Sequence, residues 1–540
     1  MSYFAINRVP DIVTVQLAAD LVTLRKDGAE RWQSTGGQSA VELTTKVLDA
    51  EQRITLTAPR AAVKRIALRW QQRVPASLRF LGDHWERGYG DLEWRGLVPE
   101  RRMPWYFLAY DGSRTHGYGV RTGASAICFW QVDSQGITLW LDVRNGAHGV
   151  ELGTRPLQAA AIVSREGKEG ESPFQAARTF CRLLCPAPVL PPQPVYGGNN
   201  WYYAYGRSSH QEILDDSKLI ASLVPSTDNR PYMVIDDGWQ LCHISTCNGG
   251  PWRQGNYLFP DMAGLAHQMR ALGVRPGIWC RPLLTLEKVP EHWLLPERSL
   301  PGKSVGLTLD PSLPDVLQHV QEDMRCILDW GFELIKHDFS TFDVLGKWGW
   351  EMKKDVTVPD WSFADRSRTT AEIIRAFYQS ITDVAEGRAL VLGCNTIGHL
   401  AAGLFALQRT GDDTSGTQWE RTRFMGVNTL AFRMPQHGTF FAVDADCVGL
   451  TKDVPWEMNR LWLDILARSG TPLFVSAAPD AIGPEQERAL RAAFALAALP
   501  RLLAEPLDWL ATTCPADWLI DGETLHYDWY EPTGVRYSFQ

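Results

Sequence analysis

The sequence lacks the features that point to nucleic-acid or membrane partners. It has no long basic run and its formal net charge is −8, so we expect neither nucleic acid nor an anionic membrane surface as a partner. No stretch of about 18 apolar residues occurs, which predicts that the chain has no transmembrane helix. Residues 1–20 contain no basic segment followed by a long apolar run, so no signal peptide is expected.

Paired cysteines and glycine-rich phosphate loops are also missing. The ten cysteines are scattered without the spacing of a zinc finger, and the pair Cys181 and Cys185 has no second pair to match it. We therefore expect mostly reduced cysteines, a cytoplasmic protein and no metal or other cofactor.

Tryptophan, in contrast, is abundant. The chain has 22 Trp residues among 540, with an otherwise ordinary 45% of hydrophobic and 21% of charged residues. Such an excess fills the cores of a large protein, and it equally suits a pocket that stacks flat rings against the apolar faces of sugars.

The organisation of the chain predicts three parts. Residues 1–185 are rich in short alternating runs, such as 12–17, 53–57, 64–70 and 137–143, which is typical of an antiparallel β-sandwich. A proline-rich stretch then gives a stiff linker, and the tail at 500–540 alternates weakly enough to predict only a small β region.

Between these parts, residues 195–490 alternate apolar runs with amphipathic segments. Helices are expected near 210–223, 262–272, 314–330 and 366–386. The candidate strands are 199–205, 232–235, 275–280, 332–336, 389–394, 405–409, 439–443 and 473–476. Because no glycine-rich phosphate fingerprint follows these strands, we predict a (β/α)8 TIM barrel rather than a doubly wound sheet.

Acidic side chains stand where four of these strands end. They are Asp236 and Asp237, Asp338, Asp412 and Asp413, and Asp444 and Asp446. Function gathers at the carboxyl ends of barrel strands, and buried carboxylates are costly unless they are paired. This pattern predicts a chemistry that uses at least two carboxylates, and glycoside hydrolysis is the obvious match. Strand alternation places Lys336 and Asp338 on one face, whereas His337 points to the opposite face and is expected to pack between strand and helix.

At these residues the chain resembles the melibiase-like α-galactosidases of glycoside hydrolase families 36 and 27, in clan D. The resemblance runs through residues 195–480 and rests on four segments in order. They are Asp236-Asp237-Gly238-Trp239, Lys336-His337-Asp338, Gly393-Cys394-Asn395 and Arg409-Thr410-Gly411-Asp412.

The resemblance implies a retaining α-glycosidase acting on terminal galactose-like sugars. Asp338 would be the nucleophile and Asp412 the acid/base, with Asp413 as its rival. Lys336 would bind a hydroxyl and hold Asp338 ionised, and Arg409 would contact the sugar or orient the acid/base. The expected substrate-binding residues are Asp236, Asp237, Trp239, Trp279, Lys336, Cys394, Arg409 and Asp413; Trp239 and Trp279 would be stacking walls, or else core residues.

Two departures from the family pattern concern the pocket wall. Family 36 α-galactosidases usually carry Trp-Phe-Glu-Pro-Glu after the third strand, where this chain has Trp279-Cys280-Arg281-Pro282. The glycine-rich run after the fifth strand is reduced to Asn395-Thr396-Ile397-Gly398. Galactose specificity is therefore an open question.

Three alternatives remain from the sequence. A transglycosylase of the raffinose-synthase type would use the same two carboxylates, with a sugar hydroxyl replacing water. A catalytically inactive sugar-binding protein would have no need of an acid/base pair. A metal-dependent hydrolase would need ligands at metal-binding spacing, and only His337 lies near the acidic residues. The expected partner is an oligosaccharide or glycoside substrate. The sequence leaves open whether the chain forms a homo-oligomer.

Overall fold

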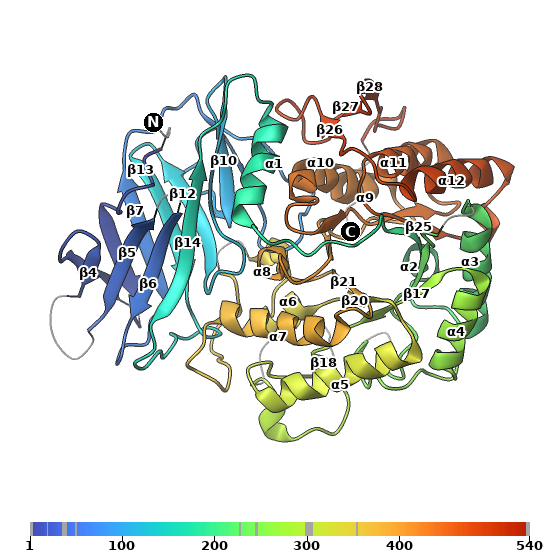
Figure 1. Cartoon of the computed structure of the whole chain (residues 1–540), viewed down its shortest axis with the longest axis horizontal. Helices are drawn as coiled ribbons and strands as arrows, with labels where there is room; N and C mark the ends of the chain where they lie inside the picture. The colour runs from blue at the N-terminus through green and yellow to red at the C-terminus, as the bar shows by residue number, and fades with distance from the viewer. Residues whose placement is uncertain are drawn as a thin grey trace.

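The computed structural model describes residues 4–18, 20–34, 40–48, 51–225, 228–243, 247–296, 306–352 and 355–535. Its N-terminal third is a two-sheet sandwich, its centre is a parallel barrel, and a small antiparallel sheet lies near the C-terminal helices (Figure 1).

The sandwich consists of two antiparallel sheets. One has the order β2-β1-β7-β13-β12-β9 and the other β3-β4-β5-β6-β14-β11-β10-β8. In β6 the residues Gln52, Ile54 and Leu56 are buried and alternate with more exposed ones, as expected of a strand with one face on a core. The strands of the first sheet are β1 (Ile12–Gln16), β2 (Leu21–Thr23), β7 (Arg65–Gln71), β9 (Met103–Pro104), β12 (Ile127–Asp133) and β13 (Gly136–Asp142). Those of the second are β3 (Arg25–Lys26), β4 (Arg31–Gln33), β5 (Glu42–Leu48), β6 (Glu51–Thr57), β8 (Arg79–Gly82), β10 (Tyr106–Tyr110), β11 (Thr115–Val120) and β14 (Leu157–Arg165).

Helix α1 (Pro173–Leu184) joins the sandwich to the barrel. It begins at Ser172, whose hydroxyl accepts a hydrogen bond from the Gln175 amide, and Pro173 suits the first helical turn. Its Phe180 packs on β11 at Gly117, where an added Cβ would lie 2.3 Å from the ring. The close approach of helix and sheet therefore depends on that glycine.

The barrel has nine parallel strand segments in the order β23-β22-β21-β20-β17-β16-β15-β25-β24. The two end segments, β23 and β24, follow each other in the chain, so together they form one bent strand and the barrel closes with eight. The segments are β15 (Tyr196–Asn199), β16 (Tyr232–Ile235), β17 (Arg275–Cys280), β20 (Leu334–His337), β21 (Leu390–Gly393), β22 (Leu407–Arg409), β23 (Ala442–Asp444), β24 (Cys447–Leu450) and β25 (Leu473–Ala477).

The bend in the strand formed by β23 and β24 lies at Ala445 and Asp446. Asp446 has a φ of 77°, a left-handed conformation that non-glycine residues seldom adopt. Its carboxylate is held there by the Thr414 amide at 2.8 Å and by Arg409 at 2.9 Å. This bend turns an acidic side chain inward in the middle of the strand.

Helices surround the barrel. The longer ones are α3 (His210–Leu223), α4 (Met262–Leu272), α5 (Pro314–Trp330), α7 (Thr370–Ala385), α11 (Trp456–Arg468) and α12 (Pro484–Ala497). Shorter helical segments are α2 (Trp201–Ala204), η1 (Glu291–Trp293), α6 (Ser340–Leu345), η2 (Gly349–Glu351), α8 (Gly398–Ala401), α9 (Trp419–Thr422), η3 (Arg423–Asn428), α10 (Thr429–Arg433), η4 (Met434–Gln436) and η5 (Pro479–Ala481). The remaining strands are β18 (Leu284–Thr285), β19 (Leu307–Thr308), β26 (Glu505–Pro506), β27 (Asp517–Ile520) and β28 (Glu523–His526).

The predicted barrel and sandwich are confirmed, but the first barrel strand was placed wrongly. We expected it at 199–205, whereas β15 ends at Asn199 and α2 follows. The Asn199 side chain accepts a hydrogen bond from the Trp201 amide at 2.8 Å, and Tyr205 adopts a φ of 46°. These local turns stop the aromatic run from continuing as a strand.

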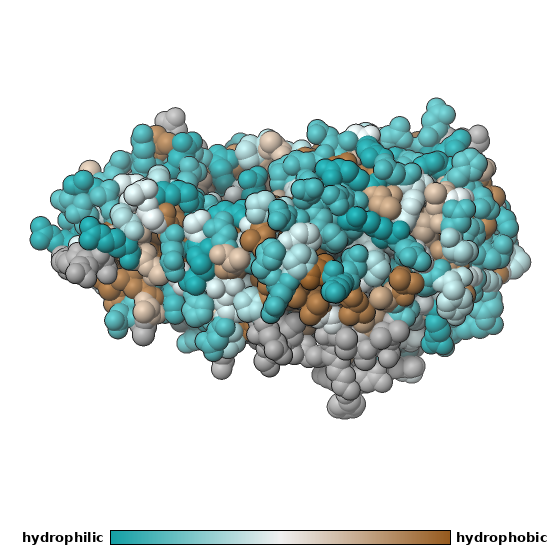
Figure 2. Space-filling model, turned by 90° about the horizontal axis from the view of Figure 1, so that it is seen from below, coloured by the Kyte–Doolittle hydropathy of each residue, from teal (hydrophilic) through white to brown (hydrophobic). Residues whose placement is uncertain are grey.

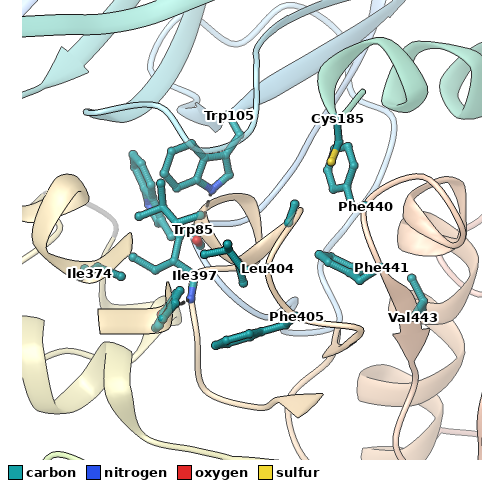
Figure 3. Packing of buried hydrophobic residues seen from close by; sticks show 14 of the residues in the cluster. Trp85, Trp105, Cys185, Ile374, Ile397, Leu404, Phe405, Phe440, Phe441 and Val443 are labelled. Carbon is teal, nitrogen blue, oxygen red and sulfur yellow. Dashed lines mark hydrogen bonds between the residues drawn. The ribbon is translucent and has the colours of Figure 1, made fainter. Parts of the chain in front are cut away.

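An apolar interface joins the sandwich to the barrel (Figure 3). Trp105 of the sandwich stacks on His399 of the barrel, with 4.6 Å between ring centroids. The His399 ring nitrogen Nε2 lies 2.8 Å from the Val120 carbonyl of the sandwich. Figure 3 also shows Trp85 and Trp105 above Ile397, Leu404 and Phe405, so several tryptophans serve this contact.

The outer surface seen from below is mostly hydrophilic, with hydrophobic side chains gathered toward its middle (Figure 2). Within the described ranges no helix combines the length and apolar character that crossing a bilayer requires. All ten cysteines lie in those ranges and are unpaired.

Candidate active site

The carboxyl ends of the barrel strands bring the acidic residues to one face of the barrel. Asp236 follows β16, Asp338 follows β20, Asp412 lies beyond β22, and Asp444 ends β23. Asp236, Asp338 and Asp444 are all less than 10% exposed. Parallel strands place these ends together, so residues far apart in the sequence share one site.

Asp338 is held by three N–H donors from three segments. Its Oδ2 accepts a hydrogen bond from Trp279 Nε1 at 3.0 Å. Its Oδ1 accepts from the backbone amides of Phe339 at 2.7 Å and Asn395 at 3.0 Å. Phe339 has a φ of 64°, and this left-handed turn directs its amide back to the carboxylate. The side chain therefore has one fixed orientation at the barrel mouth.

Lys336 makes its ion pair with Asp236 rather than with Asp338. The Lys336 Nζ lies 2.6 Å from Asp236 Oδ2, and Asn199 Nδ2 donates to the same oxygen at 2.7 Å. Burial opposes the charged ammonium, but the Asp236 carboxylate outweighs it and holds the pKa of Lys336 well above its ordinary value. That Lys336 keeps Asp338 ionised stays a prediction.

Asp237 is fixed by side chains from the loop after β16. Its Oδ1 accepts from Gln240 Nε2 at 2.6 Å and lies 3.1 Å from His243 Nδ1. Its Oδ2 accepts from Asn248 Nδ2 at 3.0 Å. The hydrogen bond to Asp237 raises the pKa of His243. Both oxygens of this predicted sugar ligand are thus oriented before any sugar binds.

We expect Asp236→Asn to lower kcat/KM by about 10²-fold. The substitution removes the counter-charge of Lys336, and it disturbs both Asp236 and Lys336, which would hold sugar hydroxyls. The check is steady-state kinetics on any aryl α-glycoside that the unaltered protein is found to cleave. Asp215→Asn, at an exposed site on α3 that pairs with Lys218, is the matched control. Full activity of Asp236→Asn on every such glycoside would refute its role.

Arg281, one of the departures in the third-strand segment, forms a buried ion pair. Its Nη2 lies 2.5 Å from Asp343 Oδ1 of α6, and its Nη1 donates to Asn248 Oδ1 at 2.5 Å. The guanidinium also lies 4.2 Å from the centroid of the Phe339 ring. Arg281 thereby links the loop that holds Asp237 to the turn that holds Asp338.

Replacing Arg281 with methionine should destabilise the fold by about 3–5 kcal/mol, because Asp343 would remain as a buried carboxylate without its cation. Chemical denaturation monitored by circular dichroism gives this value. The double variant Arg281→Met with Asp343→Leu should recover much of the loss, since no buried charge is left over. An unchanged unfolding midpoint for the single variant would contradict the argument.

Asp412 is contacted by two arginines. Arg87 Nη2 lies 3.1 Å from Asp412 Oδ1, and Arg421 Nη2 lies 3.0 Å from Asp412 Oδ2. The Asp412 side chain is 20% exposed, so it is open to the mouth. Arg409, the cation that the sequence placed nearest, contacts its neighbour Asp413 instead.

Asp413 has a different electrostatic setting. Burial alone would raise the pKa of Asp413, but the guanidinium groups of Arg409 and Arg87 outweigh it and lower the pKa to about 2. A group with such a pKa is deprotonated at neutral pH and cannot begin a reaction as an acid. Because Arg87 contacts both Asp412 and Asp413, the choice of Asp412 for the acid/base role stays a prediction.

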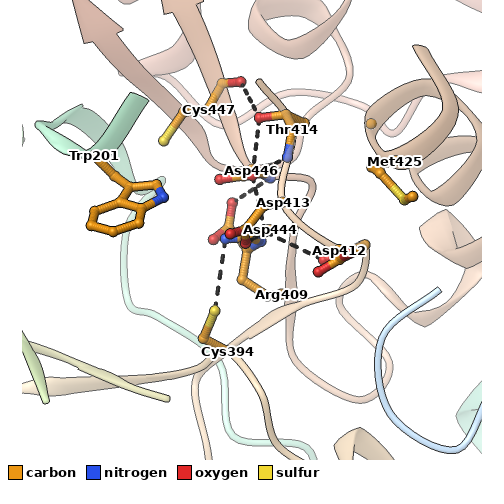
Figure 4. Close-up of polar contacts among 12 residues, drawn as sticks. Trp201, Cys394, Arg409, Asp412, Asp413, Thr414, Met425, Asp444, Asp446 and Cys447 are labelled. Atoms are coloured by element: carbon orange, nitrogen blue, oxygen red, sulfur yellow. Dashed lines mark hydrogen bonds and ion pairs between the residues drawn. The ribbon is translucent and has the colours of Figure 1, made fainter. Parts of the chain in front are cut away.

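Arg409 connects three strand ends beneath these acids (Figure 4). It reaches Asp446 at 2.9 Å and Asp413 at 3.1 Å, and its Nη1 lies 3.7 Å from the Cys394 sulfur. Burial raises the pKa of the Cys394 thiol, which is therefore neutral at this position. Burial also raises the pKa of Asp444 to about 6. Arg409 has a fixed place in this network, and its predicted contact with a sugar stays a prediction.

The two tryptophans proposed as stacking walls are fully buried. Trp239 is 0% and Trp279 is 1% exposed, and the Trp239 indole donates to the Trp279 carbonyl at 2.8 Å. Trp279 touches Asp338, so its placement favours support of the carboxylate. Their stacking role stays a prediction. His337 packs against Phe377 and Tyr378 of α7, away from the mouth, as strand alternation predicted.

The sandwich contributes residues that the sequence did not identify. The Glu86 side chain accepts a hydrogen bond from Asn395, and the neighbouring Arg87 contacts Asp412. Gly88 pairs with the barrel, since its amide donates to the Thr410 carbonyl at 2.7 Å. An added Cβ at Gly88 would lie 2.8 Å from the Thr429 methyl, so only glycine fits. The one available signal was the run Trp85-Glu86-Arg87-Gly88-Tyr89-Gly90, in which charged residues stand between glycines and aromatics.

In the part of the chain that the structure describes, no three His, Cys, Asp or Glu side chains are grouped to hold a metal ion. The described site is an acidic barrel mouth with fixed carboxylates, which is the class of site expected of barrel enzymes that act on polar, hydroxylated ligands.

A scan against protein-family models and a search of the curated proteins both find no match. Solved structures do match. The α-galactosidase TtGalA from Thermus thermophilus, in complex with p-nitrophenyl α-D-galactopyranoside, has a TM-score of 0.62 and 18% identity, covering 96% of this chain and 99% of that one. The GH36 α-galactosidase AgaA from Geobacillus stearothermophilus has a TM-score of 0.60 and 15% identity, covering 95% and 79%. The galactosidase domain of the α-galactosidase–sucrose kinase AgaSK has a TM-score of 0.55 and 17% identity, covering 92% and 70%. The chain therefore has the fold of the GH36 α-galactosidases.

Proposed function

We propose that this protein is a retaining α-glycosidase that hydrolyses terminal α-linked galactose-like sugars. The observation that carries the proposal is the Asp338 carboxylate, fixed at the end of the fourth barrel strand by Trp279, Phe339 and Asn395. A nucleophile must be held in line with the carbon that it attacks, and three donors from three segments supply that orientation.

The reaction has two displacements. An Asp338 oxygen attacks the anomeric carbon while the bond to the leaving oxygen breaks, and Asp412 gives its proton to that oxygen. Asp412 then takes a proton from water, whose oxygen attacks the same carbon and releases Asp338. Each step inverts the anomeric carbon, so the product keeps the α configuration.

The fixed polar groups beside Asp338 suit a sugar ring. Asp236, Asp237 and Lys336 offer oriented charged partners to ring hydroxyls. The ligands of the structural neighbours support this class of substrate, since TtGalA was solved with a nitrophenyl galactoside and with stachyose. The unpaired cysteines support a reducing, cytoplasmic setting.

A panel of nitrophenyl α-glycosides tests the proposal. It should include the α-glycosides of galactose, N-acetylgalactosamine and glucose, together with the β-L-arabinopyranoside. We expect the α-galactoside to be cleaved, and proton NMR during the first minutes should show the α anomer of the free sugar. The β anomer as first product would refute retention, and no cleavage of any member would refute the glycosidase assignment.

A further inference from the structure

One short segment of the sandwich reaches both sides of the barrel mouth. Residues 86–88 follow β8, and they contact the segment after β21 on one side and the loop 410–412 after β22 on the other. All three residues are buried, and the Glu86 side chain is only 1% exposed. Because three consecutive residues touch both segments, they can fix how far apart those segments lie.

On the side of the predicted nucleophile, Glu86 holds Asn395. The Glu86 carboxylate accepts a hydrogen bond from the Asn395 side-chain amide, and the Phe342 backbone amide donates to Asn395 Oδ1 at 3.2 Å. These two contacts orient the Asn395 side chain from both ends. The backbone amide of Asn395 in turn donates to Asp338 Oδ1 at 3.0 Å. Glu86 is therefore one residue removed from the Asp338 carboxylate.

The hydrogen bonds of Glu86 require a carboxylate. Besides Asn395, the Tyr89 hydroxyl and the Gly349 amide donate to it, the latter at 2.8 Å. Three donors thus converge on two oxygens, whereas a carboxamide would turn an N–H group toward one of those donors. Burial raises the pKa of Glu86, and the guanidinium of the adjacent Arg87 opposes that effect.

On the side of the predicted acid/base, Gly88 pairs with the loop 410–412. The Gly88 amide donates to the Thr410 carbonyl at 2.7 Å, and the Gly88 carbonyl accepts from the Asp412 amide at 2.9 Å. These two bonds make a parallel bridge between Gly88 and Gly411. The sandwich therefore holds the backbone of Asp412, in addition to the contact that Arg87 makes with its side chain.

The pairing of Gly88 with the loop leaves no room for adjustment. An added Cβ at Gly88 would lie 2.8 Å from the Thr429 methyl group. An added Cβ at Gly411 would lie 2.3 Å from the Met425 carbonyl oxygen. The loop is thus packed between the sandwich segment and the helical segments η3 and α10, so a shift of one should move the other.

The distance between two catalytic carboxyl groups decides what a glycosidase does. A retaining enzyme needs about 5–5.5 Å between them and an inverting enzyme about 6.5–9.5 Å. We propose that residues 86–88 are a spacer that sets the separation between Asp338 and Asp412. Glu86 positions Asp338 through Asn395, and Gly88 positions Asp412. This inference rests on the proposed function, because it takes these two aspartates as the reacting groups.

Leaving-group dependence separates the two ends of the spacer. Glu86→Gln keeps the side-chain volume but turns an N–H group toward a donor, so Asn395 should shift and Asp338 with it. We expect kcat/KM to fall by on the order of tenfold or more, equally for a nitrophenyl and a methyl α-galactoside. Gly88→Ala should displace Asp412 and weaken proton transfer. The methyl galactoside should then lose about tenfold more than the nitrophenyl galactoside, because nitrophenol leaves with little protonation.

A swap and a control distinguish position from general damage. Glu86→Gln combined with Asn395→Asp exchanges donor and acceptor, so it should restore the contact and most of kcat/KM. Glu372→Gln of α7 is the matched control, since Glu372 also joins barrel to sandwich, 2.8 Å from Arg155, and it should keep full activity. Full activity of Glu86→Gln, or equal losses of Gly88→Ala on the two galactosides, would overturn the proposal.

Crystal structures of the variants test the spacer without any turnover. We expect the separation between the Asp338 and Asp412 carboxyl groups to change by about 1 Å in Glu86→Gln and in Gly88→Ala, and to return in the swap variant. Glu86→Gln alters no volume and keeps the test available if Gly88→Ala does not fold. An unchanged separation in the single variants would refute the spacer. Absence of glycosidase activity in the unaltered protein would refute the proposed function instead, and the crystal structures would still decide on the spacer.

Discussion

Asp338→Ala is expected to lower turnover of every glycoside by on the order of 10⁴-fold or more, because the proposed mechanism needs Asp338 as the nucleophile that forms the covalent glycosyl-enzyme. The carboxylate has three donors whose positions come from β17, the turn at Phe339 and the segment after β21. Steady-state assays with a nitrophenyl α-galactoside measure the loss.

Azide distinguishes loss of a nucleophile from loss of the fold. In Asp338→Ala a small anion can enter the vacated space and attack once, so the product should be the β-glycosyl azide. Asp329→Asn, exposed on α5 and paired with Arg388, serves as the control and should keep full activity. Turnover by Asp338→Ala at near the normal rate, without azide, would remove Asp338 from the mechanism.

Asp412→Ala should affect the two half-reactions unequally. A nitrophenol leaves with little protonation, so the first step should survive in part, whereas an unactivated disaccharide should lose on the order of 10³-fold. The second step lacks its base and should be slow, and azide should accelerate it. Because the intermediate on Asp338 is already inverted, this azide product should keep the α configuration.

Asp413→Ala is the variant to compare with Asp412→Ala. Asp413 lies beside Asp412 and shares the Arg87 contact, at 3.5 Å rather than 3.1 Å. With its pKa near 2, Asp413 should supply charge and not a proton. Added azide should therefore not restore the activity of Asp413→Ala. Azide rescue of Asp413→Ala alone, or a β-glycosyl azide from Asp412→Ala, would require the acid/base assignment to be withdrawn.

The regular helices were predictable because their signals are local. Helix α4 matched its expected range of 262–272, as Asp261 caps its start and Gly273 ends it with a φ of 104°. Helix α5 matched 314–330 for similar reasons, with Pro314 at its start and Gly331 at its end. Such caps depend only on residues that are neighbours in the chain, so the sequence alone is enough to predict them.

The site was predictable only in part. Strand-end placement located Asp236, Asp338 and Asp412, because barrel geometry brings strand ends together regardless of detail. The partners of those groups depend on tertiary contacts. Lys336 lies on the same strand face as Asp338, yet its ammonium reaches across to Asp236 on another strand. No periodic pattern in the sequence indicates which of the two carboxylates Lys336 pairs with.

Contacts between the sandwich and the barrel were the least predictable from the sequence. Arg87 and Asp412 are separated by most of the chain, and their contact depends on how one folded part docks on the other. The bend between β23 and β24 also involves contacts distant in the sequence, since Arg409, Tyr202 and Thr414 hold the Asp446 carboxylate.

The insertion of residues 86–88 into the barrel mouth has a consequence for how this protein can change over generations. A barrel separated from its sandwich would lose Arg87 beside Asp412 and Glu86 beside Asn395, so we expect recombination at the linker to disturb this site even if both halves folded. We therefore expect the two parts to be inherited together. New specificities should arise by substitution within the shared mouth, not by exchange of whole modules.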